Sequence, residues 1–119
     1  GSNRTPFGTP FELTEEEIEL LLRGAMERMK KNVHNILVTH APPRGTLDQI
    51  GGNRVGSPAL RSHLPRFDLV CCAHIHEARG QTEVEGVRVV NPGPASEGYC
   101  ALITLGDESR DIRVELLTV

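Results

Sequence analysis

The stretch that decides the fold is DLVCCAHIH, residues 68–76. An unbroken apolar run from Leu69 to Ala73 leads directly into two histidines, His74 and His76. A short, continuous apolar run is typical of a strand that is buried on both faces, as the strands of parallel sheets are. We therefore expect a buried strand whose carboxyl end carries a His-x-His motif.

A second apolar run, Ile36 to Val38, ends in the same way, at Thr39-His40. Between the two runs, Ser57-Pro58 predicts the start of a short helix, because serine caps helices and proline fits their first position. Strand, helix and strand form a βαβ unit, whose strands run parallel with a right-handed crossover. Parallel strands end on the same edge of a sheet, so His40 is expected close to the His-x-His motif.

The spacing inside the motif predicts that three imidazoles converge. In an extended segment, side chains two residues apart point to the same side, which brings His76 to the same place as His74. Neutral imidazole is a good ligand for ions such as zinc, iron and nickel. We therefore predict that His40, His74 and His76 are metal ligands. His34 precedes its strand and His63 lies on the short helix, so both are expected to be ordinary surface or boundary residues.

A long helix is predicted to begin at Thr14. Thr14 and Glu17 form a capping box, and glutamates 15–17 place negative charge at the positive end of the helix dipole. Lys30 and Lys31 suit the carboxyl end, which Asn32 is expected to cap. The apolar stripe expected to face the core contains Ile18, Leu21, Leu22, Ala25 and Met29.

The rest of the chain predicts a long loop followed by antiparallel strands. The loop covers residues 41–56, and a loop of this length without secondary structure is typical of a lid or binding loop. Strands are expected at residues 81–84 and 87–90, joined by a turn at Glu85-Gly86, and at residues 99–105 and 112–116. The last strand alternates apolar and charged residues. We predict an α/β fold with one mixed sheet and flanking helices, and a single domain over residues 1–119.

Composition narrows the function classes. Hydrophobic residues make up 38% of the 119 residues and charged residues 24%, which is ordinary for a globular domain. The net charge is -3 without a basic block, so nucleic acid is not expected as a general partner. The three cysteines have no disulfide-framework spacing and no apolar run is long enough for a membrane span, so we expect a soluble, cytoplasmic protein.

Four motifs, in this order and over most of the chain, resemble the second half of calcineurin-like metallophosphoesterases. In that family the histidines that match His40 and His74 bind one metal ion, and the histidine that matches His76 binds the other. The resemblance implies hydrolysis of a phosphomonoester or phosphodiester by a hydroxide that bridges two ions, commonly Mn, Fe, Zn or Ni. It also implies half of a four-layer α/β sandwich. The matching stretches are residues 38–43 (VTHAPP), 56–57 (GS), 68–77 (DLVCCAHIHE) and 91–93 (NPG).

The chain lacks the motifs that the first half of the family's domain carries. The earlier motifs Asp-x-His, Gly-Asp-x-x-Asp and Gly-Asn-His-Asp/Glu, which supply the remaining ligands and the acid, are not in these residues. The glycine before the first histidine of the pair is replaced by Ala73. We therefore expect the isolated chain to be inactive. Strands that are apolar on both faces need two covering layers, so an exposed apolar face is expected to pair with an N-terminal half or with a second copy.

The long loop contributes further candidates. Arg44 and Arg54 flank it and are predicted to bind a substrate phosphate, with solvated loop arginines as the alternative. Asp48 is interpreted as a solvated loop carboxylate. Gly93 is expected to serve a turn that needs a positive φ.

Two other functions stay open on the sequence. One is a noncatalytic metal-binding or dimerisation module that is left from such an enzyme. The other is a hydrolase with one metal ion on three histidines, complete in this chain, which needs an open position for water. In that case Glu77 is the nearest candidate for a base.

Overall fold

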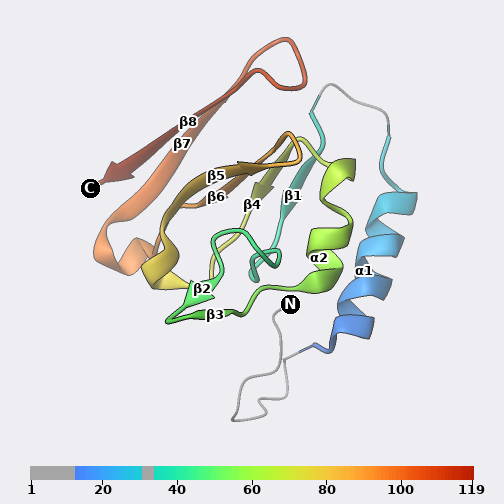
Figure 1. The fold of residues 1–119 in the computed structure, drawn as a ribbon. Coiled ribbons are helices and arrows are strands. Elements are labelled where there is room, and N and C mark those ends of the chain that lie inside the picture. The colour runs from blue at the N-terminus through green and yellow to red at the C-terminus, as the bar shows by residue number, and fades with distance from the viewer. Residues whose placement is uncertain (1–12, 31–33) are drawn as a thin grey trace.

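The computed structural model describes residues 13–30 and 34–119. Within them, a four-stranded sheet is flanked by two helices on one side and by a hairpin on the other (Figure 1). The helices and strands are α1 (Glu15–Glu27), β1 (Ile36–Val38), β2 (Gln49–Ile50), β3 (Asn53–Arg54), α2 (Pro58–Ser62), β4 (Leu69–Cys71), β5 (Gly80–Val84), β6 (Val87–Asn91), β7 (Tyr99–Leu105) and β8 (Ile112–Thr118). Three 3-10 turns complete the list: η1 (Leu64–Arg66), η2 (His76–Ala78) and η3 (Ala95–Glu97).

The main sheet is mixed, with the strand order β1-β4-β6-β5. β1 pairs with β4 in parallel, β4 pairs with β6 in parallel, and β5 pairs with β6 antiparallel. The α/β fold with one mixed sheet and flanking helices is therefore confirmed. β1 and β4 are the two strands of the predicted βαβ unit, and they are parallel neighbours that end on one edge of the sheet.

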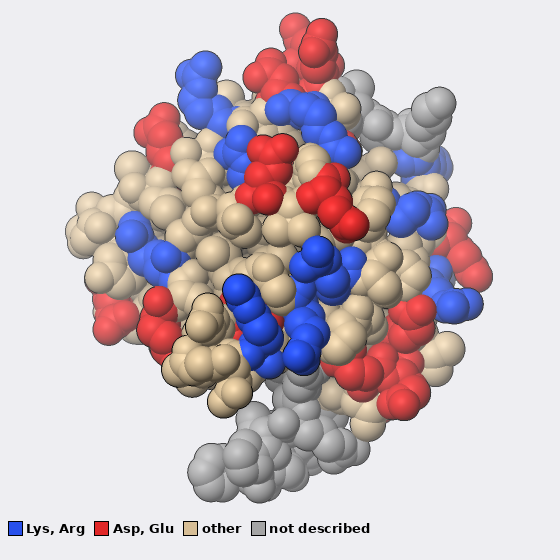
Figure 2. All heavy atoms as spheres, in the orientation of Figure 1, with Lys and Arg blue, Asp and Glu red and all other residues tan. Residues whose placement is uncertain are grey.

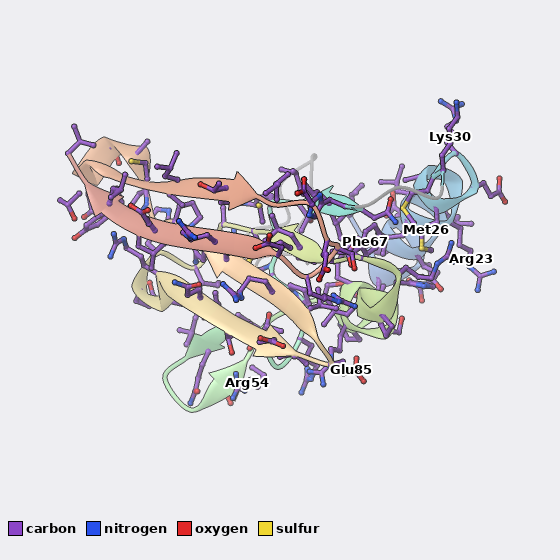
Figure 3. The ribbon with its side chains drawn as sticks, turned by 90° about the horizontal axis from the view of Figure 1, so that it is seen from above. Arg23, Met26, Lys30, Arg54, Phe67 and Glu85 are labelled. Carbon is purple, nitrogen blue, oxygen red and sulfur yellow. The ribbon has the colours of Figure 1, made fainter. Side chains whose placement is uncertain are left out.

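Two hydrophobic clusters lie on opposite faces of this sheet. On one face, Val70, Val87 and Val89 pack against α1, α2 and η1. On the other face, Leu69 and Val90 pack against the β7–β8 hairpin. Figure 3 shows this hairpin at the left of the molecule, beside the sheet, and Met26 of α1 at the right. Because successive strand residues point to opposite faces, each buried strand contributes to both clusters.

α1 begins as its sequence predicts. The Thr14 side chain accepts a hydrogen bond from the Glu17 backbone N–H, and the Glu17 side chain accepts one from the Thr14 N–H, so the capping box is formed. The helix ends at Glu27, earlier than expected, and Asn32 lies outside the described residues. The predicted stripe is partly wrong: Ile18 and Leu22 are buried, but Leu21 is 61% exposed and Ala25 is exposed as well. Met26, which was not expected in the stripe, is buried. The helix therefore meets the core along a narrower line at i, i+4 and i+8.

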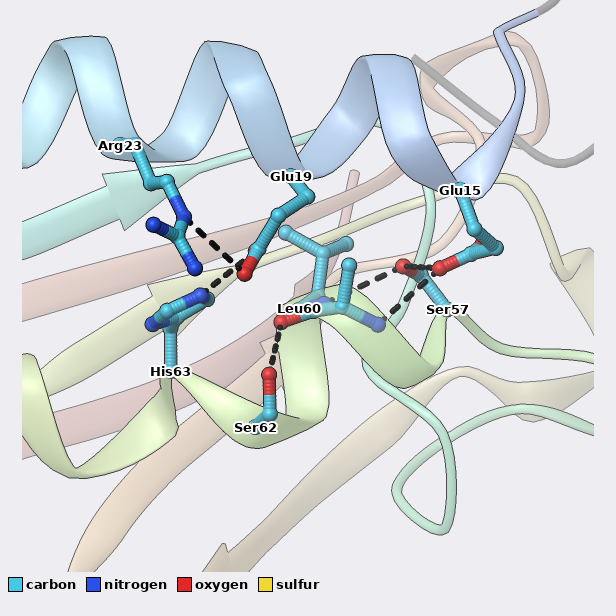
Figure 4. Close-up of polar contacts among 8 residues, drawn as sticks. Glu15, Glu19, Arg23, Ser57, Leu60, Ser62 and His63 are labelled. Atoms are coloured by element: carbon cyan, nitrogen blue, oxygen red, sulfur yellow. Dashed lines mark hydrogen bonds and ion pairs between the residues drawn. The ribbon is translucent and has the colours of Figure 1, made fainter.

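Two glutamates of α1 contact residues at the two ends of α2 (Figure 4). The Glu15 carboxylate accepts hydrogen bonds from the Ser57 hydroxyl at 2.8 Å and the Ala59 backbone N–H at 3.0 Å. One turn later, the Glu19 carboxylate lies 2.6 Å from His63 Nε2 and 3.4 Å from Arg23 Nε. The contacts of Glu15 with Ser57 and Ala59 and of Glu19 with His63 hold the first helix against the crossover helix, whereas the contact with Arg23 lies within α1.

Three expectations about strands and loops were wrong in detail. β1 is an edge strand and not covered on both faces, with Val38 78% exposed. The loop at residues 41–56 contains a short hairpin, β2–β3, that turns at Gly51-Gly52. β7 and β8 do not extend the main sheet but form a two-stranded sheet of their own. Each difference depends on which segments pack together, and a short apolar pattern does not specify that.

Charges are mixed on the face seen in Figure 2, where acidic and basic side chains are interspersed among neutral ones. In the part of the chain that the structure describes, no helix is long and apolar enough to cross a membrane. α1 buries Ile18, Leu22 and Met26 and α2 buries Leu60, so each flanking helix turns one side towards the core.

Candidate metal centre

The structure brings His40 and His74 together at the carboxyl edge of the parallel strands. His40 Nε2 lies 2.9 Å from His74 Nδ1, and the two rings meet edge to face with centroids 4.8 Å apart. The backbones are tied as well, because the Ala73 N–H donates a 2.9 Å hydrogen bond to the His40 carbonyl. The predicted approach of the first and second strand ends is therefore observed, with both imidazoles exposed.

His74 has an uncommon backbone conformation. Its φ is 70°, and the Ile75 N–H donates a 2.8 Å hydrogen bond to the Ala73 carbonyl two residues before it. An i to i+2 hydrogen bond around a residue with φ near +75° is a γ-turn of the rare and strained hand. This turn directs the His74 ring towards His40.

The same turn separates His76 from the pair. Alternation of side chains holds only in an extended segment, but His74 lies in a γ-turn and His76 begins the 3-10 turn η2. Among residues 13–30 and 34–119, no three His, Cys, Asp or Glu side chains come together in a group that could hold a metal ion. The three-histidine ligand set therefore stays a prediction, of which the structure brings two members into contact.

The environment of His40 favours its neutral form. Partial desolvation of the imidazole, followed by the charges of the nearby His74 and His76, lowers the pKa of His40 below its ordinary value. A neutral imidazole retains the lone pair that a metal ion needs. His34 and His63, which were not expected to be ligands, contact the Glu108 carbonyl and Glu19 respectively.

The donor pair meets a simple distance test for a shared ion. An imidazole nitrogen lies about 2.0–2.1 Å from a bound zinc ion, so two such nitrogens are separated by at most about 4.2 Å. The observed 2.9 Å lies below this limit, and it is also a hydrogen-bond distance, so an ion that binds here displaces the proton between the two nitrogens. Burial, followed by the charges of Cys71 and Asp48, raises the pKa of the neighbouring Cys72 thiol to about 12.

Asp48 holds the Gly-rich loop together through its hydrogen bonds. It is buried, so the expectation of a solvated loop carboxylate was wrong. Its Oδ2 accepts hydrogen bonds from the backbone N–H groups of Gly45 at 3.0 Å and Gly56 at 2.9 Å. Its Oδ1 accepts one from Arg54 Nη1 at 3.0 Å, and the Asp48 side chain is 0% exposed. The sequence signal was a lone aspartate among glycines, which does not distinguish a buried loop carboxylate from a solvated one.

The two predicted phosphate-binding arginines differ in how they are held. Arg54 is 47% exposed and oriented by Asp48, on the hairpin side of the molecule (Figure 3). Arg44 is exposed, and its backbone carbonyl accepts a hydrogen bond from Arg61 Nη1. Arg54 lines a hollow of about 550 Å³ between the β2–β3 hairpin and η2, the turn that begins at His76. Glu77 lines the same hollow.

Sequence reasoning missed the part played by Asn91 and Arg79. Asn91 is buried, and its Nδ2 donates a 2.8 Å hydrogen bond to the Ile75 carbonyl, inside the His-x-His motif. Arg79 Nε donates to the Pro92 carbonyl at 3.0 Å. The available signal was the Asn-Pro-Gly motif itself, whose Gly93 has the expected positive φ of 87°.

Comparisons with known proteins found a longer relative and a solved structure of similar fold. No protein-family model matches the chain. An uncharacterized protein of Methanocaldococcus jannaschii is 42% identical over 105 residues, which cover 81% of this chain and 46% of that protein. The chain thus spans about half the length of this curated relative. A solved crystal structure matches with a TM-score of 0.70 at 20% identity, over 90% of this chain and 40% of its own, and this likeness shows the fold alone.

Proposed function

We propose that this chain supplies part of the metal centre of a phosphoesterase, an enzyme that hydrolyses a phosphomonoester or phosphodiester with the help of divalent ions. The observation that carries the proposal is the 2.9 Å approach of His40 Nε2 to His74 Nδ1. It occurs at the carboxyl edge of parallel strands, where open α/β sheets bind ligands. The resemblance of the surrounding motifs to calcineurin-like phosphoesterases supports the same function.

In this proposal the three histidines hold the ions. His40 and His74 bind one ion, and His76 contributes to a second once the remaining ligands are present. Mn, Fe, Zn or Ni suits imidazole donors, and such ions supply an activated water and neutralise charge on the phosphate.

The described cysteines Cys71, Cys72 and Cys100 are free thiols, which supports a reducing, cytoplasmic location.

Arg54 is the better of the two candidates for gripping a substrate phosphate. Asp48 orients its guanidinium through Nη1, and the half-exposed side chain lines the hollow next to η2. A guanidinium that is held in place loses less side-chain entropy when it forms a two-pronged hydrogen bond to phosphate. Arg44 is exposed and is expected to contribute less.

The proposed enzyme needs a partner on the α1–β1 side of the sheet. β1 is one of the two edge strands of the main sheet in the described part of the chain, and an apolar groove of about 190 Å³ runs between α1 and β1. Val38 and Leu21 lie along the groove and are exposed. Because the curated relative is more than twice as long as the matched segment, we propose that an N-terminal half of the domain covers this face.

A noncatalytic metal-binding or dimerisation module is the second candidate. The same exposed apolar groove favours it, because a second copy of the chain can cover the face in place of an N-terminal half. In that case His40 and His74 bind an ion without turnover. The two candidates differ in hydrolysis and in the number of chains per particle.

Metal binding is tested first, by isothermal titration of the purified chain with Zn²⁺. We expect binding that is lost in the His40→Ala and His74→Ala variants. His34→Ala and His63→Ala are matched controls, because they remove imidazoles that contact Glu108 and Glu19, and they are expected to bind as the wild type does. Equal binding by all four variants contradicts the proposed centre.

Hydrolysis is tested with bis-(p-nitrophenyl) phosphate and p-nitrophenyl phosphate in the presence of Mn²⁺. We expect no turnover by the chain alone and turnover when the chain is expressed together with an N-terminal half, lost again in His40→Ala. Sedimentation velocity of the chain alone gives its oligomeric state. A stable dimer that binds zinc, and no turnover in the combined protein, favours the noncatalytic module.

A further inference from the structure

The γ-turn at His74 needs support from outside its own segment. A non-glycine residue with φ of 70° is strained, and such a conformation persists only where the surrounding structure fixes it. The local hydrogen bond from the Ile75 N–H to the Ala73 carbonyl closes the turn but does not anchor it. Anchoring requires a contact to the peptide groups on either side of the His74 ring.

Asn91 supplies that contact on the carboxyl side. It ends β6, its side chain is buried, and its Nδ2 donates to the Ile75 carbonyl at 2.8 Å. Its Oδ1 accepts a 3.1 Å hydrogen bond from the Gly93 N–H. Both ends of the amide are used, so the side chain cannot rotate without the loss of a buried hydrogen bond.

The segment after Asn91 fastens η2 as well. Arg79, which follows η2, donates from Nε to the Pro92 carbonyl and stacks its guanidinium over the Tyr99 ring at 4.3 Å. A Cβ on Gly93 would lie 2.7 Å from Arg79 Cδ, so only glycine leaves room for this side chain. The His-x-His motif is thus held to residues 91–93 both at Ile75 and just after η2.

We infer that Asn91 is a positioning residue for the metal centre: it fixes the γ-turn that places His74 Nδ1 against His40 Nε2. The expected effect on metal affinity rests on the proposed function, because Asn91 acts through the position of His74 and is not itself a proposed ligand. Outer residues that orient metal ligands typically change metal affinity by about 10- to 100-fold when they are replaced. We expect an effect of that size for loss of the Asn91 donor.

Two variants separate the donor from the turn. Asn91→Leu keeps nearly the same shape and removes both hydrogen bonds. Asn91→Asp, measured at a pH at which NMR shows its carboxylate to be ionised, can still accept from the Gly93 N–H but cannot donate to the Ile75 carbonyl. Thr46→Val is the matched control, because it removes one buried hydrogen bond from a side chain to a backbone carbonyl, that of Pro43. If Asn91→Leu does not fold, Asn91→Asp carries the test.

The first readout is Zn²⁺ affinity by isothermal titration. Asn91→Leu and Asn91→Asp are expected to bind about 10- to 100-fold more weakly than the wild type, and Thr46→Val within about twofold of it. Unchanged affinity in both Asn91 variants overturns the inference. Absence of zinc binding in the wild type overturns the proposed function instead, and the second readout then decides on Asn91.

The second readout is amide hydrogen exchange at Ile75, followed by NMR in the metal-free protein. The Ile75 N–H closes the γ-turn, so its protection reports how firmly that turn is held. Exchange is expected to be at least about 10-fold faster in both Asn91 variants and unchanged in Thr46→Val, since a lost buried hydrogen bond changes an equilibrium constant by roughly that factor. Equal protection in all proteins shows that Asn91 does not hold the turn and refutes the inference.

Discussion

Replacing Asp48 by asparagine tests how the Gly-rich loop is held. The carboxylate is 0% exposed and accepts hydrogen bonds from Gly45, Gly56 and Arg54. Asparagine has the same shape, but it has one acceptor oxygen and no charge. It can keep the two backbone hydrogen bonds, in weaker form, and it turns its NH₂ towards the Arg54 guanidinium.

The size of the effect follows from these contacts. Hydrogen bonds to a charged group contribute about 1.5–3 kcal/mol each and neutral ones about 0.5–1.5 kcal/mol, so the two backbone bonds weaken by about 1 kcal/mol each. Arg54 is half exposed, and solvent screening limits its ion pair to at most about 1 kcal/mol. We expect Asp48→Asn to lower the free energy of unfolding by about 2–3 kcal/mol.

Urea denaturation followed by circular dichroism measures this difference. Asp107→Asn is the control, because Asp107 is exposed in a turn and its replacement is expected to change the free energy of unfolding by less than about 0.5 kcal/mol. Arg54→Ala is expected to cost at most about 1 kcal/mol. A change below about 0.5 kcal/mol for Asp48→Asn, or a larger cost for Arg54→Ala than for Asp48→Asn, refutes the assignment of the loop's stability to the two backbone amides.

Two further predictions concern α1. Thr14→Ala removes the hydrogen bond to the Glu17 N–H and is expected to cost about 1 kcal/mol in the free energy of unfolding, whereas an unchanged value argues against the capping box. Burial alone would raise the pKa of the Glu19 carboxyl, but the hydrogen bond and charge of His63, followed by those of Arg23, hold that pKa below its ordinary value of 4.5. Because the unfolded chain takes up this proton first as the pH falls, the stability that Glu19 contributes is present above about pH 4.5 and is lost below it. The difference in melting temperature between the wild type and Glu19→Gln is therefore expected to shrink from pH 7 to pH 3, and a constant difference contradicts the coupling to His63.

Much of the fold could be predicted because its signals are local. The capping box at Thr14, the turn at Glu85-Gly86 between β5 and β6, and the Ser57-Pro58 start of α2 each depend on residues within four positions of one another. The structure has all three. Local patterns of this kind need no knowledge of the rest of the chain.

The errors lie where packing between distant segments decides. Leu21 has the right spacing for the core but points to the exposed side, because only a narrow line of α1 meets the sheet. The β2–β3 hairpin has two residues in each strand, too few for an alternating pattern to be recognised. Asp48 is buried because residues on both sides of it, from Gly45 to Gly56, fold around its carboxylate.

The sequence by itself determined the order of the elements and the meeting of two strand ends. An apolar run followed by histidine occurs twice, and the two strands of a βαβ unit run parallel, so both end on one edge and His40 and His74 come together. Only the tertiary structure decided the conformation of the His-x-His motif. A γ-turn at His74 is unfavourable on its own. We infer that it is held by the buried side-chain amide of Asn91, which donates a hydrogen bond to the carbonyl of Ile75, sixteen residues earlier in the chain. Contacts over such a separation depend on the folded sheet, and no local pattern encodes them.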